Sequence, residues 1–164
     1  MKEAVAQSLY TELFGAIDAV WSSELFVSMG SEIERAFAAA MVVGLRMSDV
    51  GKLDVCSYPP REESGALFFL CPQVEIGPYR VDFILGGYRD HGGLLRCVAI
   101  ECDGHAWHEK TKEQAARDKQ RDRYLSNHVG RVIHFTGSEI YVDASRCCSE
   151  AGQALLTASF GGRR

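Results

Sequence analysis

The sequence predicts an α/β domain of mixed α+β character, in which a mixed sheet of four or five strands lies between layers of helices. Three observations support this prediction. The chain has 164 residues, which matches one domain of roughly 150 residues. Hydrophobic residues make up 46% and charged residues 24%, as in packed globular proteins and unlike disordered or fibrous chains. Helical and strand-like patterns follow one another in the order α-α-β-β-β-α-β-α, which is typical of a three-layer domain.

Two helices are expected before the main strands. In residues 2–21 apolar side chains recur at steps of three and four residues, which is the spacing of one helix face. Two serines at 22 and 23 interrupt this pattern. A second helix is expected from Ser31 to about Arg46, since Ser31 and Glu34 form the pattern of a capping box.

These patterns divide the chain without requiring a second domain. We predict a single domain over 1–164, with an N-terminal helical extension over 1–30 and a core over 31–164. The apolar stripe of the extension is expected to cover the sheet, as helices of single domains usually do. Docking of a protein partner, or of a second copy as a homodimer, is the alternative.

A meander of antiparallel strands is expected next. The connector 49–65 contains two prolines, and a short strand is expected in it near 54–57. Glycine-containing turn signals separate the strand patterns that follow. The last of these patterns is apolar at nearly every position, as in a central strand covered on both faces. The three predicted strands are 67–76, 79–85 and 94–102, with turns at 77–78, 86–87 and 92–93.

The C-terminal third returns to helices around one further strand. Residues from 109 to about 128 are strongly polar with a helical pattern that ends at Gly130, as a C-terminal glycine predicts. A strand is expected over 131–135, and a last helix over 143–159 with apolar residues on one side.

The composition predicts a cytoplasmic protein with no membrane partner. The longest run without polar or charged residues, 36–45, is half as long as a membrane-spanning helix requires. The N-terminus lacks the pattern of a secretory signal. The six cysteines form no C-x-x-C pair and are expected to be reduced thiols.

The charge is unevenly distributed along the chain. The formal net charge is −4. Residues 1–104 carry eight basic and fifteen acidic side chains, whereas 105–131 carry seven basic and four acidic ones. An acidic centre beside a basic stripe is typical of enzymes that hold metal ions next to a polyanion, although many other proteins show it by chance.

Carboxylates stand at unusual places in two of the predicted strands. Asp82 lies between two hydrophobic residues, and Glu101 and Asp103 end the apolar strand before a glycine. Buried carboxylates cost several kcal/mol unless a positive charge meets them. If the strands are neighbours, Asp82 and Glu101 can converge on Mg²⁺ or Mn²⁺, with the backbone carbonyl of Cys102 as a further oxygen ligand.

Two other interpretations of these residues remain open. In the first, Asp82 pairs with an arginine of its own sheet, while Glu101 and Asp103 cap the next helix. In the second, a C-x-x-H-x-x-H spacing binds zinc. Zinc is disfavoured because Cys102 should point away from Glu101, and because further cysteines close by are absent. The residues concerned are Arg80 and Arg96 in the first case and Cys102, His105 and His108 in the second.

Four motifs together resemble the PD-(D/E)xK nuclease superfamily, and within it the very-short-patch-repair-like endonuclease domains. The motifs are V-D-F at 81–83, E-C-D-G-H-A-W-H at 101–108, R-D-K-Q-R-D-R-Y-L at 117–125 and G-R-V-I-H-F at 130–135. The resemblance covers about 31–164. It implies a restriction-endonuclease-like core and an Mg²⁺-dependent endodeoxyribonuclease, with Mn²⁺ as a substitute and DNA as the partner.

The resemblance also implies roles for individual residues. Asp82 and Glu101 match the metal-binding carboxylates. Asp103 stands where many members carry the lysine of E-x-K, which leaves the water-activating group open and makes Asp103 a further metal ligand. His108 matches a histidine beside the metal that serves proton transfer or holds the water of the metal. Glu34 matches an acidic residue on the helix before the sheet, although its capping box offers a structural explanation as well.

The polar helix that follows is the expected DNA-binding element. Arg117, Arg121 and Tyr124 fall on one face at steps of three and four residues. The spacing Gln120-x-x-x-Tyr124 resembles a motif of the exonuclease-like branch of the superfamily. A solvated helix face explains the basic residues nearly as well. The DNA-binding candidates are Lys110, Lys112, Arg117, Lys119, Gln120, Arg121 and Tyr124.

The function expected from these observations is hydrolysis of DNA phosphodiester bonds by metal-activated water. The alternative is a catalytically inactive nuclease-like module that binds DNA or a protein.

Overall fold

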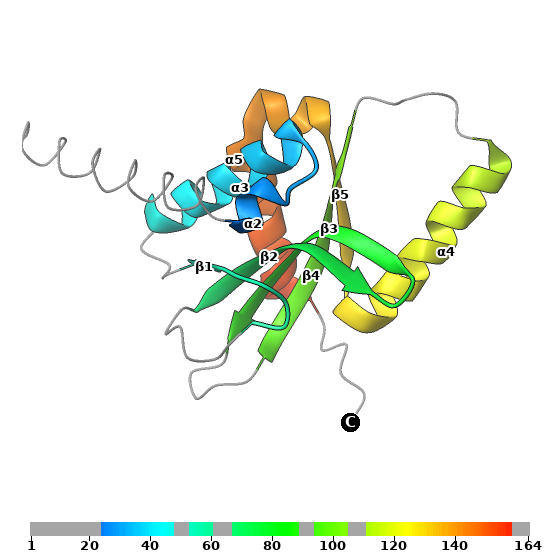
Figure 1. Cartoon of the computed structure of the whole chain (residues 1–164), viewed down its shortest axis with the longest axis horizontal. Coiled ribbons are helices and arrows are strands. Elements are labelled where there is room, and N and C mark those ends of the chain that lie inside the picture. The colour runs from blue at the N-terminus through cyan, green and yellow to red at the C-terminus, as the bar shows by residue number, and fades with distance from the viewer. Residues whose placement is uncertain (1–23, 48–52, 61–66, 89–93, 105–110, 159–164) are drawn as a thin grey trace, which may run out of the picture.

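The computed structural model describes residues 24–47, 53–60, 67–88, 94–104 and 111–158 (Figure 1). The predicted helix over 2–21 lies outside these residues. Among the helices that are described, none is long and apolar enough to cross a membrane. The elements are α2 (Glu24–Val27), α3 (Glu32–Met47), β1 (Leu53–Val55), β2 (Phe68–Ile76), β3 (Tyr79–Tyr88), β4 (Leu94–Asp103), α4 (Lys112–Val129), β5 (Val132–Thr136) and α5 (Gly137–Thr157).

The five strands form one mixed sheet in the order β1-β2-β3-β4-β5. Strands β2, β3 and β4 are antiparallel neighbours, which confirms the predicted meander. Strand β1 runs parallel to β2 and β5 runs parallel to β4. The parallel pairing of β5 follows from helix α4, because a crossover helix returns the chain to the starting end of the neighbouring strand.

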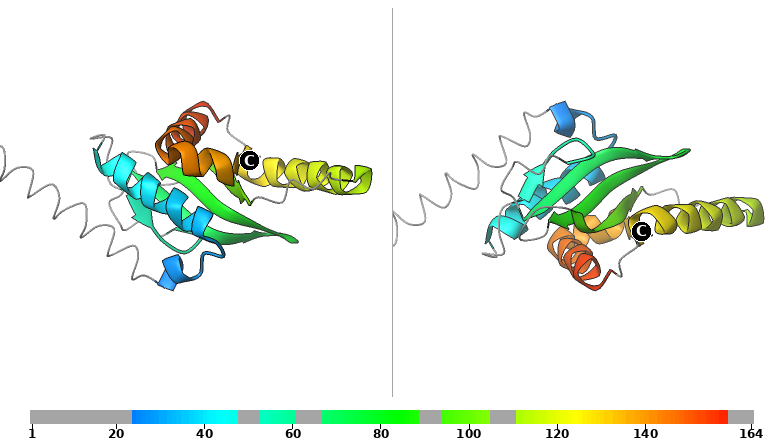
Figure 2. Two further views of the ribbon diagram at one scale, coloured as in Figure 1. Left: turned by 90° about the horizontal axis from the view of Figure 1, so that it is seen from above. Right: turned by 90° about the horizontal axis from the view of Figure 1, so that it is seen from below.

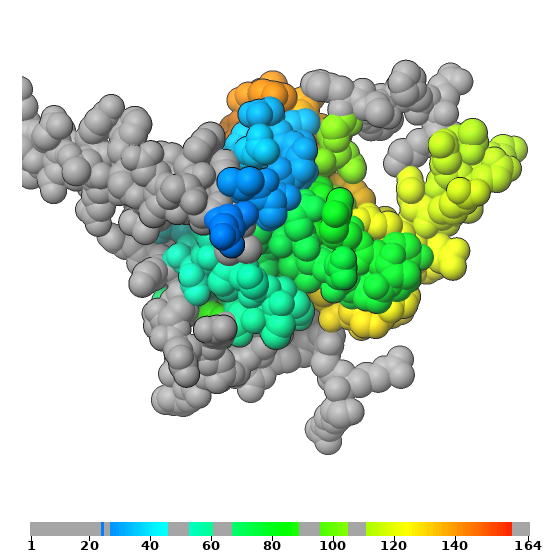
Figure 3. All heavy atoms as spheres, viewed as in Figure 1, coloured from blue at the N-terminus to red at the C-terminus, as the bar shows by residue number. Residues whose placement is uncertain are grey.

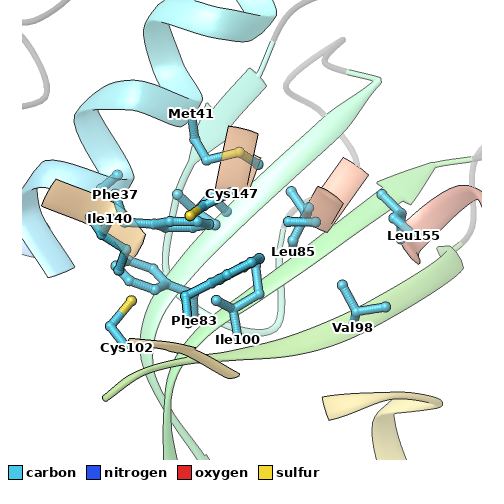
Figure 4. Packing of buried hydrophobic residues seen from close by; sticks show 14 of the residues in the cluster. Phe37, Met41, Phe83, Leu85, Val98, Ile100, Cys102, Ile140, Cys147 and Leu155 are labelled. Carbon is cyan, nitrogen blue, oxygen red and sulfur yellow. The ribbon is translucent and has the colours of Figure 1, made fainter. Parts of the chain in front are cut away.

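Helices α3 and α5 cover one face of the sheet and enclose the larger apolar core (Figures 1 and 4). Phe37 of α3 lies at its centre, with ring centroids 5.6 Å from Phe83 of β3 and 5.7 Å from Phe135 of β5. All three rings are buried. These contacts fasten α3 to the middle of the sheet.

Helix α4 covers part of the other face. Its buried residues, Leu125 and Val129, lie near its C-terminal end and join a smaller apolar cluster on β2, β3 and β4. The N-terminal half of α4 extends beyond the edge of the sheet (Figure 2) and stands apart from the described residues of β3 and β4 (Figure 3). Helices on both faces of a mixed sheet are compatible with the predicted three layers.

Two sequence signals were misinterpreted. Gly86 and Gly87 were predicted to form a turn, but both lie inside β3, where Gly86 pairs with Phe69 and Cys97. Gly86 is required there because a Cβ atom would collide with the ring of Phe69.

The last helix begins at Gly137 rather than at 143. Thr136 caps this earlier start with a capping box to Glu139. The helix is kinked at Asp143, whose carboxylate accepts a hydrogen bond from the backbone N–H of Arg146 at 2.9 Å. The predicted start at 143 therefore corresponds to this internal cap.

Candidate functional site

The carboxylates of Asp82 and Glu101 meet between strands β3 and β4. Phe83 pairs with Ile100 in the antiparallel register, so Asp82 and Glu101 are the next residues along β3 and β4. The charge of Asp82 contributes to raising the pKa of Glu101, which indicates that the two carboxylates are near each other. Asp82 Oδ2 accepts a hydrogen bond from the backbone N–H of Cys102 at 2.7 Å. The carboxylate of Asp82 therefore crosses to β4, beside the position of Glu101.

The neighbouring strand β2 is irregular at the same level. Gln73 has a φ of 52°. Cys71 before it and Val74 after it are both buried in the smaller apolar cluster, although residues three positions apart point to opposite faces of a regular strand. This break in alternation is characteristic of an irregular strand position, where one side chain is redirected. The amide of Gln73 donates to Glu34 Oε2 at 2.7 Å, across from β2 to α3.

Glu34 is buried at the start of α3, where its predicted capping role is confirmed. Its carboxylate accepts hydrogen bonds from the Gly30 N–H at 3.0 Å and from the Ser31 hydroxyl at 2.8 Å. The Ser31 hydroxyl in turn accepts from the Glu34 N–H. These are capping contacts, yet the charge of Glu34 also contributes to raising the pKa of Asp82. The structure thus places Glu34 at the edge of the carboxylate pair.

Arg121 of α4 pairs with Glu101. Its Nη2 atom lies 2.5 Å from Glu101 Oε1 and donates to the carbonyl oxygen of Arg80 at 2.8 Å. Sequence reasoning placed Arg121 on the face of α4 that binds DNA, whereas in this structure its guanidinium is turned toward the carboxylates. The guanidinium of Arg96 donates to the carbonyl oxygen of Leu156, and the Asp82 carboxylate accepts from the Cys102 N–H.

The two carboxylates share an environment that disfavours two negative charges. The pKa of Glu101 is raised to about 7, chiefly by burial and also by the nearby charge of Asp82, although Arg121 acts to lower it. Burial also raises the pKa of Asp82, against the lowering effect of the Cys102 N–H. One arginine therefore does not fully compensate this pair, and additional positive charge would stabilise it.

A histidine that sequence reasoning missed lies on the next strand. His134 of β5 is in register with Glu101. Its Nδ1 lies 3.1 Å from Asp103 Oδ2 and its Nε2 lies 3.4 Å from Asp122 Oδ1. The hydrogen bond to Asp103 is the main cause that raises the pKa of His134. Its position as an ionisable residue between the apolar residues Ile133 and Phe135 of the strand was the available signal.

The DNA-binding candidates on α4 have different surroundings. Lys112, Arg117, Lys119 and Gln120 are exposed on the projecting half of the helix. Tyr124 instead packs on the turn between β2 and β3, with its ring centroid 5.3 Å from that of Tyr79. The remaining predicted site residues His108 and Lys110, and the zinc candidate His105, lie outside the described residues.

Cys102 contributes its backbone to the site and its side chain to the core. Its thiol lies in the larger apolar cluster, on the opposite face from Glu101 (Figure 4), as the strand alternation predicted. Burial raises the pKa of this thiol, with help from Asp82, which disfavours the thiolate that zinc requires. All six cysteines are free, as expected.

Among the described residues, the predicted metal donors are the carboxylates of Asp82, Glu101 and Asp103 and the backbone carbonyl of Cys102. Within the described ranges, no group of three or more His, Cys, Asp or Glu side chains is placed to hold a metal ion. The carboxylate oxygens of Asp82 and Glu101 and the carbonyl of Cys102, the residue after Glu101, are hard donors of the type that Mg²⁺ and Mn²⁺ prefer. Their incomplete compensation by Arg121 makes this donor set fit a divalent cation.

A cavity of about 320 Å³ lies away from these residues, between α3 and α5. Its lining is mainly apolar, including Met41, Leu45, Phe68 and Leu155. Since this cavity has no carboxylate or histidine in its lining, the carboxylate pair is the better candidate for chemistry.

The fold and the site together define an α/β protein whose mixed five-stranded sheet carries a half-buried carboxylate, Asp82, and a buried one, Glu101, on adjacent strands. No protein-family model matches the chain, and neither a curated protein nor a solved structure matches it significantly.

Proposed function

We propose that the protein is a metal-dependent endodeoxyribonuclease that hydrolyses DNA phosphodiester bonds. The observation that carries the proposal is the proximity of Asp82 and Glu101, which lie next to the Phe83–Ile100 pair on adjacent strands, with the Asp82 carboxylate bound to the Cys102 N–H. The motif resemblance to PD-(D/E)xK nucleases supports it, since that resemblance assigns metal binding to the same two residues. A mixed sheet between helices is compatible with the restriction-endonuclease-like core that the resemblance implies.

Asp82 and Glu101 would hold the cation, with the Cys102 carbonyl as a further ligand and Asp103 nearby. A bound Mg²⁺ would supply a Lewis acid that activates water and offsets charge on the phosphate. The chain's own groups would orient the site: the Cys102 N–H fixes the Asp82 carboxylate, and His134 fixes Asp103. His108 would transfer a proton at the attacking or leaving oxygen.

The exposed basic residues of α4 would bind the DNA backbone. Lys112, Arg117 and Lys119 lie on the half of α4 that extends beyond the sheet, where a phosphate backbone could approach without contact with the acidic core. Such phosphate contacts are independent of sequence and weaken with salt. DNA in the cytoplasm is the proposed partner. Further residues proposed to contact the DNA are Lys110, Gln120, Arg121 and Tyr124.

A second candidate function has one specific observation in its favour. Arg121 already pairs with Glu101, and a permanent ion pair there would leave Glu101 unable to bind a cation. The protein would then be a nuclease-like module that binds DNA or a protein without cutting it.

A plasmid-cleavage assay with Mg²⁺, Mn²⁺ or a chelator separates the two functions. The wild-type protein is expected to cut only with the metals. Asp82→Asn and Glu101→Gln are each expected to lose about a thousandfold in rate, because metal binding contributes several kcal/mol to phosphoryl chemistry. Glu75→Gln, which changes an exposed carboxylate on β2, is the matched control and should retain activity. Cleavage that persists in both site variants, or no cleavage by the wild type with either metal, would overturn the proposal.

A further inference from the structure

We propose that Arg121 is a positioning residue that couples cation binding to phosphate binding. Without a cation it holds the Glu101 carboxylate; when a divalent cation takes that carboxylate, Arg121 turns to the phosphate of the bound DNA. This inference rests on the proposed function and adds a regulatory step to the same site.

The contacts of Arg121 show what it does without a cation. A single nitrogen, Nη2, contacts both Glu101 Oε1 at 2.5 Å and the Arg80 carbonyl oxygen at 2.8 Å. The side chain of Glu101 is only 9% exposed, whereas that of Arg121 is 24% exposed. The arginine therefore reaches into the site from its solvent side and covers the carboxylate that a cation must reach.

The charges around the pair favour replacement of Arg121 by a divalent cation. Asp82 acts on Glu101, and Glu34 and Asp103 act on Asp82; Arg121 and His134 are the opposing charges. The guanidinium brings one positive charge and contacts one carboxylate of the pair. A divalent cation brings two charges and can contact both carboxylates, so it compensates the buried pair more completely.

Helix α4 determines where the released guanidinium can go. Arg117 lies one turn before Arg121 on the same side of the helix and is exposed. A phosphate bound by Arg117 would therefore lie within reach of Arg121. A planar guanidinium can bind two phosphate oxygens at once, which makes arginine well suited to this second role.

The first test measures Mn²⁺ binding to the full chain by calorimetry, without DNA. Arg121→Gln removes the competing charge and should tighten Mn²⁺ binding about tenfold, the equivalent of one charge-assisted hydrogen bond. Arg121→Lys keeps the charge but cannot reproduce the same contacts, and should tighten it about threefold. Arg123→Gln is the matched control, because it removes one exposed charge from the opposite side of α4; its Mn²⁺ affinity should stay within about twofold of wild type.

The second test measures thermal unfolding of the same proteins. In EDTA, Arg121→Gln should lower the Tm, because Glu101 loses its partner. Saturating Mn²⁺ should remove this deficit, since the cation takes over the pairing. A purely structural role for Arg121 would leave the deficit unchanged by Mn²⁺. If Arg121→Gln does not fold, the lysine variant carries both tests.

The outcomes separate this inference from the proposed function. Wild-type protein that binds Mn²⁺ and cuts DNA, with Arg121 variants that bind Mn²⁺ no more tightly, would overturn the coupling and leave the nuclease intact. Wild-type protein that neither binds Mn²⁺ nor cuts DNA would overturn the nuclease. If the Arg121 variants bind Mn²⁺ more tightly and Mn²⁺ restores their Tm, Arg121 competes with the cation for Glu101.

Discussion

The two faces of the sheet differ in what they bury. Of the residues that the structure describes, the face under α3 and α5 buries sixteen in one apolar cluster that is centred on Phe37. The face under α4 buries nine, and next to them it holds Glu101 with Arg121. The first face can supply most of the stability by apolar burial. The second contains carboxylates with raised pKa values. Their ionised forms lower the stability of the fold, which is typical of groups that bind a ligand such as a cation.

This contrast is the one expected when a rigid support holds a reactive group. Strands β3 and β4 belong to both faces: Phe83 and Ile100 face the larger core while Asp82 and Glu101 stand next to them in sequence. Packing of the first pair therefore fixes the positions of the second pair. Three experiments test how far the two faces can be changed independently.

The largest effect is expected on the α3 face. Phe37→Ala removes a fully buried ring in contact with Phe83 and Phe135. It should lower the free energy of unfolding by about 3–5 kcal/mol, since deletion of a buried aromatic side chain loses its burial and leaves a cavity. Urea unfolding followed by circular dichroism measures it. A loss below about 1 kcal/mol would show that this face is not the stabilising one.

A smaller effect is expected where α4 meets the β2–β3 turn. Gly77 has a φ of 58°, and a Cβ atom there would collide with the hydroxyl of Tyr124. Gly77→Ala should cost about 1–3 kcal/mol through backbone strain and displacement of Tyr124.

Gly44→Ala in α3 is the control for this change, because a Cβ atom there meets open space. That variant should be stabilised by up to about 1 kcal/mol. Equal unfolding energies for the two alanine variants, measured by urea titration, would mean that α4 does not depend on this contact.

The smallest effect is a pH dependence that belongs to the α4 face. Because the folded-state pKa of Glu101 is raised from 4.5 to about 7, the folded protein binds this proton more tightly than the unfolded chain does. Stability should therefore fall as the pH rises from about 4.5 to 7. The contribution is on the order of 1 kcal/mol once the exposure of the site is taken into account.

The difference between wild type and Glu101→Gln isolates this term from other titrating groups. Such groups include His134, whose raised pKa also makes stability fall with rising pH. The variant should lose less stability than the wild type over the same interval in urea titrations at stepped pH. Parallel curves for the two proteins would contradict a raised pKa at Glu101.

Local sequence patterns predicted much of the fold. Alternation and turn residues predicted β2, β3 and β4 as an antiparallel meander, and Ser31 and Glu34 predicted the start of α3. The turn at Gly86 failed because a glycine that makes room for a distant ring, Phe69, looks the same in sequence as a turn glycine. The first turns of α5 were not predicted because Thr136 and Glu139 cap the helix directly after a strand, with no connecting residues between the two elements.

The site was predictable only where it follows strand register. Asp82 and Glu101 could be paired because consecutive antiparallel strands place their ends together. Other residues of the site come from elsewhere: the pairing of Arg121 with Glu101 depends on how α4 docks, and the contact of Gln73 with Glu34 depends on a positive φ inside β2. His134 depends on parallel pairing of β5, a long-range contact. None of these three can be derived from periodicity alone.

The most direct test of the account is a crystal of the full chain soaked in Mn²⁺, with anomalous diffraction measured at the manganese edge. The account predicts one peak within coordination distance of carboxylate oxygens of both Asp82 and Glu101, with Arg121 moved off Glu101. Absence of a peak at full Mn²⁺ concentration, with Glu101 still on Arg121 and Asp82 still on the Cys102 N–H, would contradict it.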